Sequence, residues 1–369
     1  MVEVKEERVG SLDALRIVLC VFVIVLHFNY SHGGAALTYT AGYFYNHEFA
    51  LLCESFTICA VNGFMILSGY FLGKSQLRAV LKPLLLIFTV MGYNSFFCLA
   101  EMILNKELSV RAYVHSLIPI NYFVWLYAAV YLLSPWFNIV FEYTSKKDGA
   151  ILLLVMFGLF SAYPSVVDLY SGVTGTTINS ISTISSSDSG AGYTFVNFAF
   201  MYCIGAYIRK YDLSIKKHHC VLGYIISSGA IYATIHLTIN GLYYSNPFVI
   251  LSALFLFLAF KKSKVQSNRI TVTLAEQAFP VFIIHGCMYG LWKAFDLSKI
   301  LTGSLATAIG AFVFFVLLMY FCSVGVALLG KKVTYPVRSI LKRYIRFRYE
   351  IQEVKNNGER THQHNCPLL

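Results

Sequence analysis

Residues 12–30 read LDALRIVLCVFVIVLHFNY, a run dominated by apolar side chains. A helix of this length can cross the hydrocarbon core of a bilayer, which needs about 20 apolar residues. Arg16 and His27 are eleven positions apart in this run. At about 100° and 1.5 Å per residue, they fall within about 20° on the helix surface and roughly 16 Å apart along the axis. Because ionisable groups inside a bilayer are costly, this stripe predicts a functional site.

Each residue of this pair also has a simpler interpretation. Arg16 alone is typical of a cationic anchor at the cytoplasmic face of a membrane. His27 alone is compatible with a hydrogen-bonded residue in a helix interface. Because the two residues share one stripe, we favour a functional site over these two structural roles. In that site a cation at one membrane face would bind an anionic ligand, and an acid/base group would lie in the membrane interior.

The composition excludes a soluble globular protein. Of the 369 residues, 57% are hydrophobic and 13% are charged, whereas soluble domains carry about 25% charged residues. We therefore expect an all-α, polytopic membrane protein with about ten transmembrane helices, the first retained because it lacks a small-residue cleavage site. The predicted spans are residues 11–30, 50–72, 83–104, 120–141, 150–168, 191–208, 220–240, 246–260, 275–293 and 304–330.

The net charge of +11 is arranged for membrane orientation and not for nucleic-acid binding. With ten spans, 25 of the 29 Lys and Arg residues fall on one side, and only Lys106, Arg111, Lys293 and Lys299 fall on the other. Positive loops face the cytoplasm, so both termini are predicted there. The nine cysteines lie mostly in apolar runs without ligand spacing, so no metal site is expected.

The sequence predicts one transmembrane domain, residues 1–330, followed by a basic cytoplasmic tail, residues 331–369. Part of this tail, residues 338–349, alternates cations with Ile, Leu, Tyr and Phe. Such a segment is typical of an amphipathic helix on an anionic membrane surface. The lipid bilayer is thus an expected partner, and the sequence leaves open whether the chain forms a homo-oligomer.

The opening motif resembles a known family. Asp13, Arg16 and His27 match an Asp-x-x-Arg element followed, after ten intervening residues, by a histidine. This pattern is similar to the start of the acyltransferase-3 family, integral-membrane enzymes that acylate cell-surface sugars in bacteria.

Three later segments extend the resemblance. The run Asn62–Leu72 contains Ser68-Gly69-Tyr70, where glycine allows close helix contact or a turn and serine supplies a hydroxyl. Tyr122–Asn138 resembles the family's aromatic fourth helix, or an interfacial aromatic belt. The run Phe279–His285 places a second histidine in a predicted span, with a packing role as its simpler interpretation.

One segment departs from the family pattern. The family often shows Arg-x-x-Arg before a proline, whereas here Arg78 and Lys82 are four apart before Pro83. Because lysine lacks the planar guanidinium, bidentate phosphate binding is weakened. These residues are either cytoplasmic anchors or an electrostatic cradle for an anionic donor.

The resemblance implies an O-acyltransferase of the bacterial plasma membrane. It would move an acyl group, most simply acetyl from acetyl-CoA, to a hydroxyl of a surface polysaccharide or its lipid-linked precursor. Acyl-CoA is then a substrate, and no bound cofactor is expected. The candidate residues are Arg16, His27 and His285 for catalysis; Arg16, Ser68, Arg78 and Lys82 for the donor; and Tyr43, Tyr45 and Glu54 for the acceptor.

Two other classes share features of this sequence. A transporter or flippase for a glycolipid would also have about ten spans and intramembrane histidines, although no G-x-x-x-x-G-K-[ST] loop for ATP hydrolysis is present. A membrane-bound O-acyltransferase for lipids or proteins would also use a histidine, but does not explain the motif of Asp13, Arg16 and His27.

Overall fold

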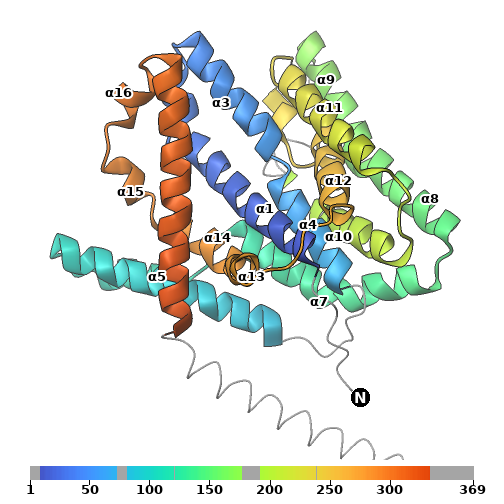
Figure 1. The fold of residues 1–369 in the computed structure, drawn as a ribbon, viewed down its shortest axis with the longest axis horizontal. Helices are drawn as coiled ribbons and strands as arrows, with labels where there is room; N and C mark the ends of the chain where they lie inside the picture. Colours follow the sequence, from blue (N-terminus) through green and yellow to red (C-terminus); the bar gives the residue numbers. More distant parts are fainter. Residues whose placement is uncertain (1–8, 73–80, 120, 177–191, 238, 333–369) are drawn as a thin grey trace, which may run out of the picture. The chain divides into compact units, whose positions relative to one another are not determined.

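The computed structural model describes residues 9–72, 81–119, 121–176, 192–237 and 239–332. Within these ranges every regular element is a helix (Figure 1). The chain divides into two compact units, residues 1–323 and 324–369, and the candidate site lies in the first. The elements are α1 (Gly10–Asn29), α2 (Ala36–Thr40), α3 (Phe44–Thr57), α4 (Ala60–Leu72), α5 (Leu81–Asn105), α6 (Val110–Ser116), α7 (Tyr122–Tyr143), α8 (Lys146–Phe157), η1 (Gly158–Ala162), α9 (Tyr163–Thr174), α10 (Phe195–Lys210), α11 (Lys217–Ile235), η3 (Ile239–Leu242), α12 (Pro247–Lys261), α13 (Arg269–Glu276), α14 (Ala278–Cys287), α15 (Gly290–Lys293), α16 (Leu297–Leu301) and a final helix, Leu305–Lys332.

Six of the described helical segments are long and apolar enough to cross a membrane. They are Gly10–Asn29, Phe44–Leu72, Pro83–Asn105, Phe123–Tyr143, Lys146–Ser171 and Leu305–Lys332. The predicted ninth span, residues 275–293, is not one helix but covers the end of α13, all of α14 and then α15. The pair α13 and α14 is bent by 52° and makes a seventh span if counted as one. The helices α10, α11 and α12 occupy the other three predicted positions, and α12 is apolar but only 15 residues long. The total of about ten spans therefore stays a prediction.

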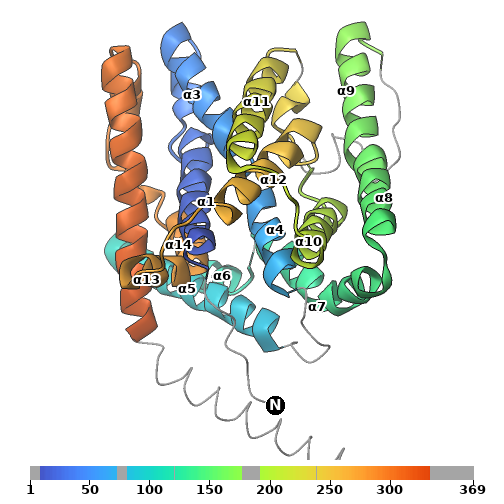
Figure 2. The ribbon, with the colours of Figure 1, turned by 45° about the vertical axis from the view of Figure 1, so that its right-hand side comes forward.

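The helix α1 contacts several other helices of the first unit. It packs against α3, α4, α12, α13 and α14 (Figures 1 and 2). Its buried side chains include Leu12, Leu15, Leu19 and Val23, which recur every three or four residues and so share one face. The helix therefore buries an apolar face, whereas Arg16 and His27 of the predicted polar stripe are only partly buried.

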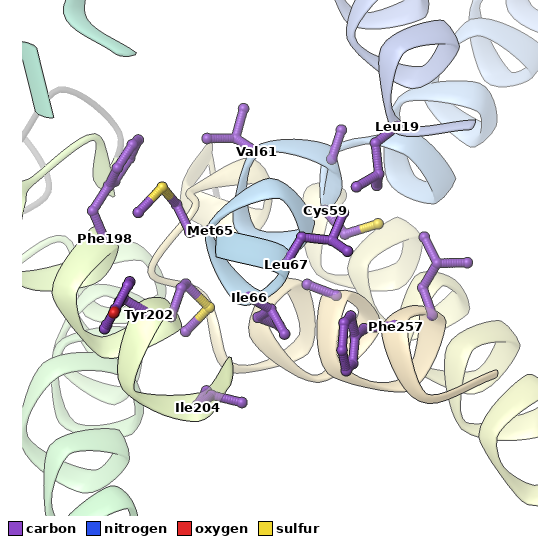
Figure 3. Packing of buried hydrophobic residues seen from close by; sticks show 14 of the residues in the cluster. Leu19, Cys59, Val61, Met65, Ile66, Leu67, Phe198, Tyr202, Ile204 and Phe257 are labelled. Carbon is purple, nitrogen blue, oxygen red and sulfur yellow. The ribbon is translucent and has the colours of Figure 1, made fainter. Parts of the chain in front are cut away.

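The helices α4 and α10 cross at a close approach that two glycines permit. A Cβ atom on Gly69 would lie 2.0 Å from the carbonyl oxygen of Tyr202, and one on Gly205 would lie 2.1 Å from that of Ile66. Only hydrogen fits at these points, which confirms the prediction that Gly69 allows close helix contact. Figure 3 shows the surrounding core, where side chains of α4 pack among those of α1, α10 and α12.

Buried amides fix the position of α4. Asn62 donates a 2.8 Å hydrogen bond to the carbonyl oxygen of Tyr244 and accepts one of 3.0 Å from the Nδ2 of Asn197. At the other end of α4, the Nδ2 of Asn138 donates a 2.8 Å bond to the carbonyl oxygen of Leu72. The last carbonyls of a helix lack partners within it, so Asn138 satisfies one of them. These contacts hold the helix that carries the Ser68-Gly69-Tyr70 motif.

Candidate active site

The helices α1 and α14 run parallel and in register. The Sγ of Cys20 donates a 3.1 Å hydrogen bond to the carbonyl oxygen of Ala278, and one ring nitrogen of His27 lies 2.5 Å from one of His285. Cys20 and His27 are seven residues apart, and so are Ala278 and His285, so the two contacts are separated by the same number of residues on both helices. The stripe between Arg16 and His27 is thus packed against α14.

The hydrogen bonds of the two histidines define which nitrogen carries each proton. The Nδ1 of His285 lies 2.9 Å from the carbonyl oxygen of Val281, which can only accept, so this nitrogen bears hydrogen. With both rings neutral, the Nε2 of His285 is an acceptor, and the Nδ1 of His27, 2.5 Å away, is its donor. The Nε2 of His27 then keeps a lone pair and is the one nitrogen of the pair able to accept a further proton.

The two rings differ in exposure. His285 is 1% exposed, whereas His27 is only partly buried. The ring of Tyr289 lies 5.8 Å from that of His27 and stacks at 5.7 Å on the fully buried Trp292. A rigid tyrosine therefore flanks the histidine that has the available nitrogen.

Arg16 is held by an ion pair and an aromatic ring. Its Nη1 lies 2.6 Å from the Oδ1 of Asp13, and its guanidinium carbon lies 4.6 Å from the centre of the Phe71 ring. The side chain of Arg16 is 30% exposed while that of Asp13 is 1% exposed. Asp13 therefore orients a cation that is partly exposed.

Arg16 lines a cavity of about 270 Å³ that is largely apolar. Four segments that the sequence pattern singled out separately meet at this cavity. Its lining comes from α1, α4, α7 and the α13–α14 pair: Arg16, Phe64, Leu67, Ser68, Phe71, Leu72, Phe123, Tyr127, Ala275, Glu276, Ala278, Phe279 and Phe282.

The cavity runs from an exposed end to a buried end. Arg16 and Glu276 are the more exposed lining residues, whereas Phe123 and Phe282 are both 6% exposed. The ring of Phe282 lies 5.9 Å from that of His285. One lining ring of the cavity thus also contacts a ring of the histidine pair.

The remaining predicted site residues lie elsewhere or are only partly defined. The hydroxyl of Ser68 lines the cavity and donates to the carbonyl oxygen of Phe64 at 2.8 Å. Glu54 accepts a 2.7 Å hydrogen bond from Asn29, two residues after His27, so it lies near the end of α1.

Two tyrosines proposed for the acceptor lie on the surface. Tyr43 is 49% and Tyr45 is 73% exposed, at the start of α3, and no described contact joins either to the histidine pair or the cavity. Arg78 lies outside the described residues, as does the side chain of Lys82. The predicted tail beyond residue 332 does too.

Sequence reasoning missed Phe282 and Tyr289. Both occur in an apolar, aromatic-rich stretch, and nothing in their spacing separates them from ordinary packing residues. One signal was present, because Phe282 precedes His285 by three positions and so shares its helix face. Within the described ranges, no three His, Cys, Asp or Glu side chains are grouped closely enough to hold a metal ion.

These features define a polytopic helical protein with a buried histidine pair beside an arginine-lined cavity. The chain belongs to the acyltransferase-3 family, whose model, described as an acyltransferase domain, matches residues 9–328. Comparison with curated proteins and with solved structures gave no match. Together with the long apolar helices, the family assigns the chain as a membrane acyltransferase.

Proposed function

We propose that this protein transfers a short acyl group, most simply acetyl, from acyl-CoA to a hydroxyl of a cell-surface saccharide or its lipid-linked precursor. The observation that carries the proposal is the hydrogen-bonded pair of His27 and His285 next to the cavity lined by Arg16. An acid/base group is what a hydroxyl needs to attack a thioester, because a neutral hydroxyl is a weak nucleophile.

In this mechanism the Nε2 of His27 accepts the proton of the acceptor hydroxyl while its oxygen attacks the thioester carbonyl. The new C–O bond forms, the C–S bond breaks, and the thiolate takes the proton back from His27 to give free CoA. His285 acts as a positioning residue, because its contact with the Nδ1 of His27 keeps the Nε2 unprotonated. A general base of this kind contributes about 10²–10⁴-fold. A variant route, with the acyl group carried briefly on His27, uses the same nitrogen.

The donor is proposed to enter at the exposed end of the cavity. Arg16 offers a guanidinium for the phosphates of CoA, held in place by Asp13. The volume of about 270 Å³ lies below the usual range for drug-sized ligands, about 300–1,000 Å³. It therefore suits the slender pantetheine arm and leaves the nucleotide outside. The apolar lining excludes water and strengthens polar contacts within the cavity.

The acceptor is proposed to approach His27 from the side flanked by Tyr289. That ring stands 5.8 Å from the imidazole, and Glu54 lies near the same end of α1 through Asn29. An aromatic face and a carboxylate are suitable contacts for a sugar. This arrangement fits ten spans in a bacterial plasma membrane with both termini cytoplasmic, because the donor end then faces the cytoplasm.

The test is acetyl transfer in membranes that contain the protein, with radiolabelled acetyl-CoA and the surface saccharide of the source cell. We expect base-labile label in the saccharide, and we expect His27→Ala to lower the rate by about 10²–10⁴-fold. Arg16→Lys is preferable to Arg16→Ala, since breaking a buried ion pair costs about 3–5 kcal/mol and Asp13 is buried. Arg16→Lys loses the planar guanidinium, and this loss should raise the KM for acetyl-CoA by about tenfold.

The same experiment distinguishes the proposed acyltransferase from a glycolipid transporter or flippase. A flippase predicts no acetylated saccharide and a change in the amount of surface glycan. Unchanged acetylation by a folded His27→Ala variant would show that His27 is not the base.

A further inference from the structure

Phe282 occupies the boundary between the donor cavity and the histidine pair. Its ring is 6% exposed, lines the buried end of the cavity and lies 5.9 Å from the ring of His285. On its cavity side it packs at 4.7 Å against Phe123, which is also 6% exposed. These two neighbouring lining rings are called the aromatic wall of the cavity below.

The described residues beside this wall are closely packed along α1. The face of α1 between Arg16 and His27 is packed on α14, where Cys20 bonds to the carbonyl oxygen of Ala278. Both Cys20 and Ala278 are buried. Phe282 both lines the cavity and contacts His285, so we expect a thioester that moves from Arg16 toward the histidine pair to meet its ring.

The wall lies on the cavity side of the histidine pair, whereas the ring of His27 is itself partly exposed and so within reach of water. A base that can deprotonate a sugar hydroxyl can deprotonate water, and water is far more abundant than any saccharide. Hydrolysis would follow the same bond changes as transfer. Water would lose its proton to the Nε2 of His27, a C–O bond would form, the C–S bond would break, and acetate and CoA would be released.

We propose that Phe282 determines the choice between transfer and hydrolysis. In the closed position its ring keeps a thioester in the donor cavity apart from His27 and from the water that reaches this partly exposed histidine, and it moves aside when the saccharide acceptor has taken the place of that water. The residue would make the protein a transferase instead of a thioesterase. This inference rests on the proposed acyl transfer from acyl-CoA.

The test measures release of free CoA from acetyl-CoA by the purified full chain in nanodiscs, with no saccharide present. Phe282→Ala should raise this release by about tenfold or more, since a general base can contribute about 10²–10⁴-fold to attack by water. Adding His27→Ala to Phe282→Ala should return the release to the unmodified level. A purely structural role for Phe282 would lower all activities and would not create this gain.

Two further variants control for loosening of the core. Phe282→Leu replaces the ring with a smaller aliphatic side chain and loses less packing than Phe282→Ala. If Phe282→Ala does not fold, Phe282→Leu should still give a smaller increase in the release of CoA. Phe257→Leu is the matched control, since Phe257 is fully buried but does not line the cavity. It should give no gain.

The outcomes separate this inference from the function on which it rests. Unmodified protein that fails to acetylate the saccharide overturns the proposed function. Unmodified protein that transfers acetyl, with folded Phe282 variants that release CoA no faster without saccharide, overturns the role of Phe282.

Discussion

The role of His285 as a positioning residue can be tested by two replacements. His285→Phe keeps an aromatic ring but removes the nitrogen that accepts hydrogen from His27. His285→Gln removes the ring but retains, at about the same reach as the Nε2, an oxygen that can accept the same hydrogen bond. The two variants therefore differ in the acceptor that faces the Nδ1 of His27, which lies 2.5 Å from His285 in the structure.

The expected effect follows from that one contact. Without an acceptor, the N–H of His27 points at a buried apolar ring, and an unsatisfied buried donor costs about 1–3 kcal/mol. The proton can avoid this cost by moving to the Nε2, which removes the base. Keeping the productive form therefore costs the same 1–3 kcal/mol, and at about 1.36 kcal/mol per tenfold this lowers kcat by about 5- to 150-fold.

The assay is the initial rate of acetyl transfer at varied acetyl-CoA. We expect His285→Phe to lower kcat within that range and to leave the KM for acetyl-CoA nearly unchanged, since His285 does not line the cavity. His285→Gln should recover kcat to within about fivefold of the unmodified protein, the size of a typical hydrogen-bond adjustment. Equal loss in two folded variants, or a change confined to KM, would refute the tautomer argument.

Two further predictions concern the scaffold. Gly69→Ala should prevent the close crossing of α4 and α10 and abolish the folded protein, because the new Cβ would lie 2.0 Å from a backbone oxygen. Gly92→Ala should fold normally, because a Cβ at that position would have nothing within 4 Å. Size-exclusion profiles in detergent distinguish the two variants. Asn62→Ala should lower stability by about 2–6 kcal/mol, because two buried polar groups lose their partner at about 1–3 kcal/mol each, and a melting temperature close to that of the unmodified protein would contradict this.

Much of the candidate site could be predicted because it depends on local helix geometry. Eleven residues nearly complete three turns, so Arg16 and His27 had to share a face whatever packed against it. The glycine of the Ser68-Gly69-Tyr70 motif marked a close contact for a similarly local reason, the absence of a Cβ. Surface tyrosines such as Tyr43 were less predictable, because aromatic residues serve equally as membrane-interface anchors and as sugar-stacking groups.

The arrangement of the ninth predicted span was harder to predict from the sequence. The apolar run around residues 275–293 predicts one continuous helix, yet the chain bends by 52° between Glu276 and Ala278. The bend places α13 and α14 separately against α1. Hydropathy reports how apolar a segment is and carries no information on where it turns, so the exposed end of the cavity at Glu276 could not be foreseen.

The sequence by itself determined a helical membrane protein and one polar stripe on its first helix, because composition and periodicity act within a single segment. Only the tertiary structure decided that His285 meets His27, that Arg16 lines a cavity, and that Phe282 of the same cavity contacts His285. These are contacts between residues up to 258 positions apart. They depend on which helix faces bury one another, and many alternative pairings of apolar faces satisfy the same pattern of hydrophobicity.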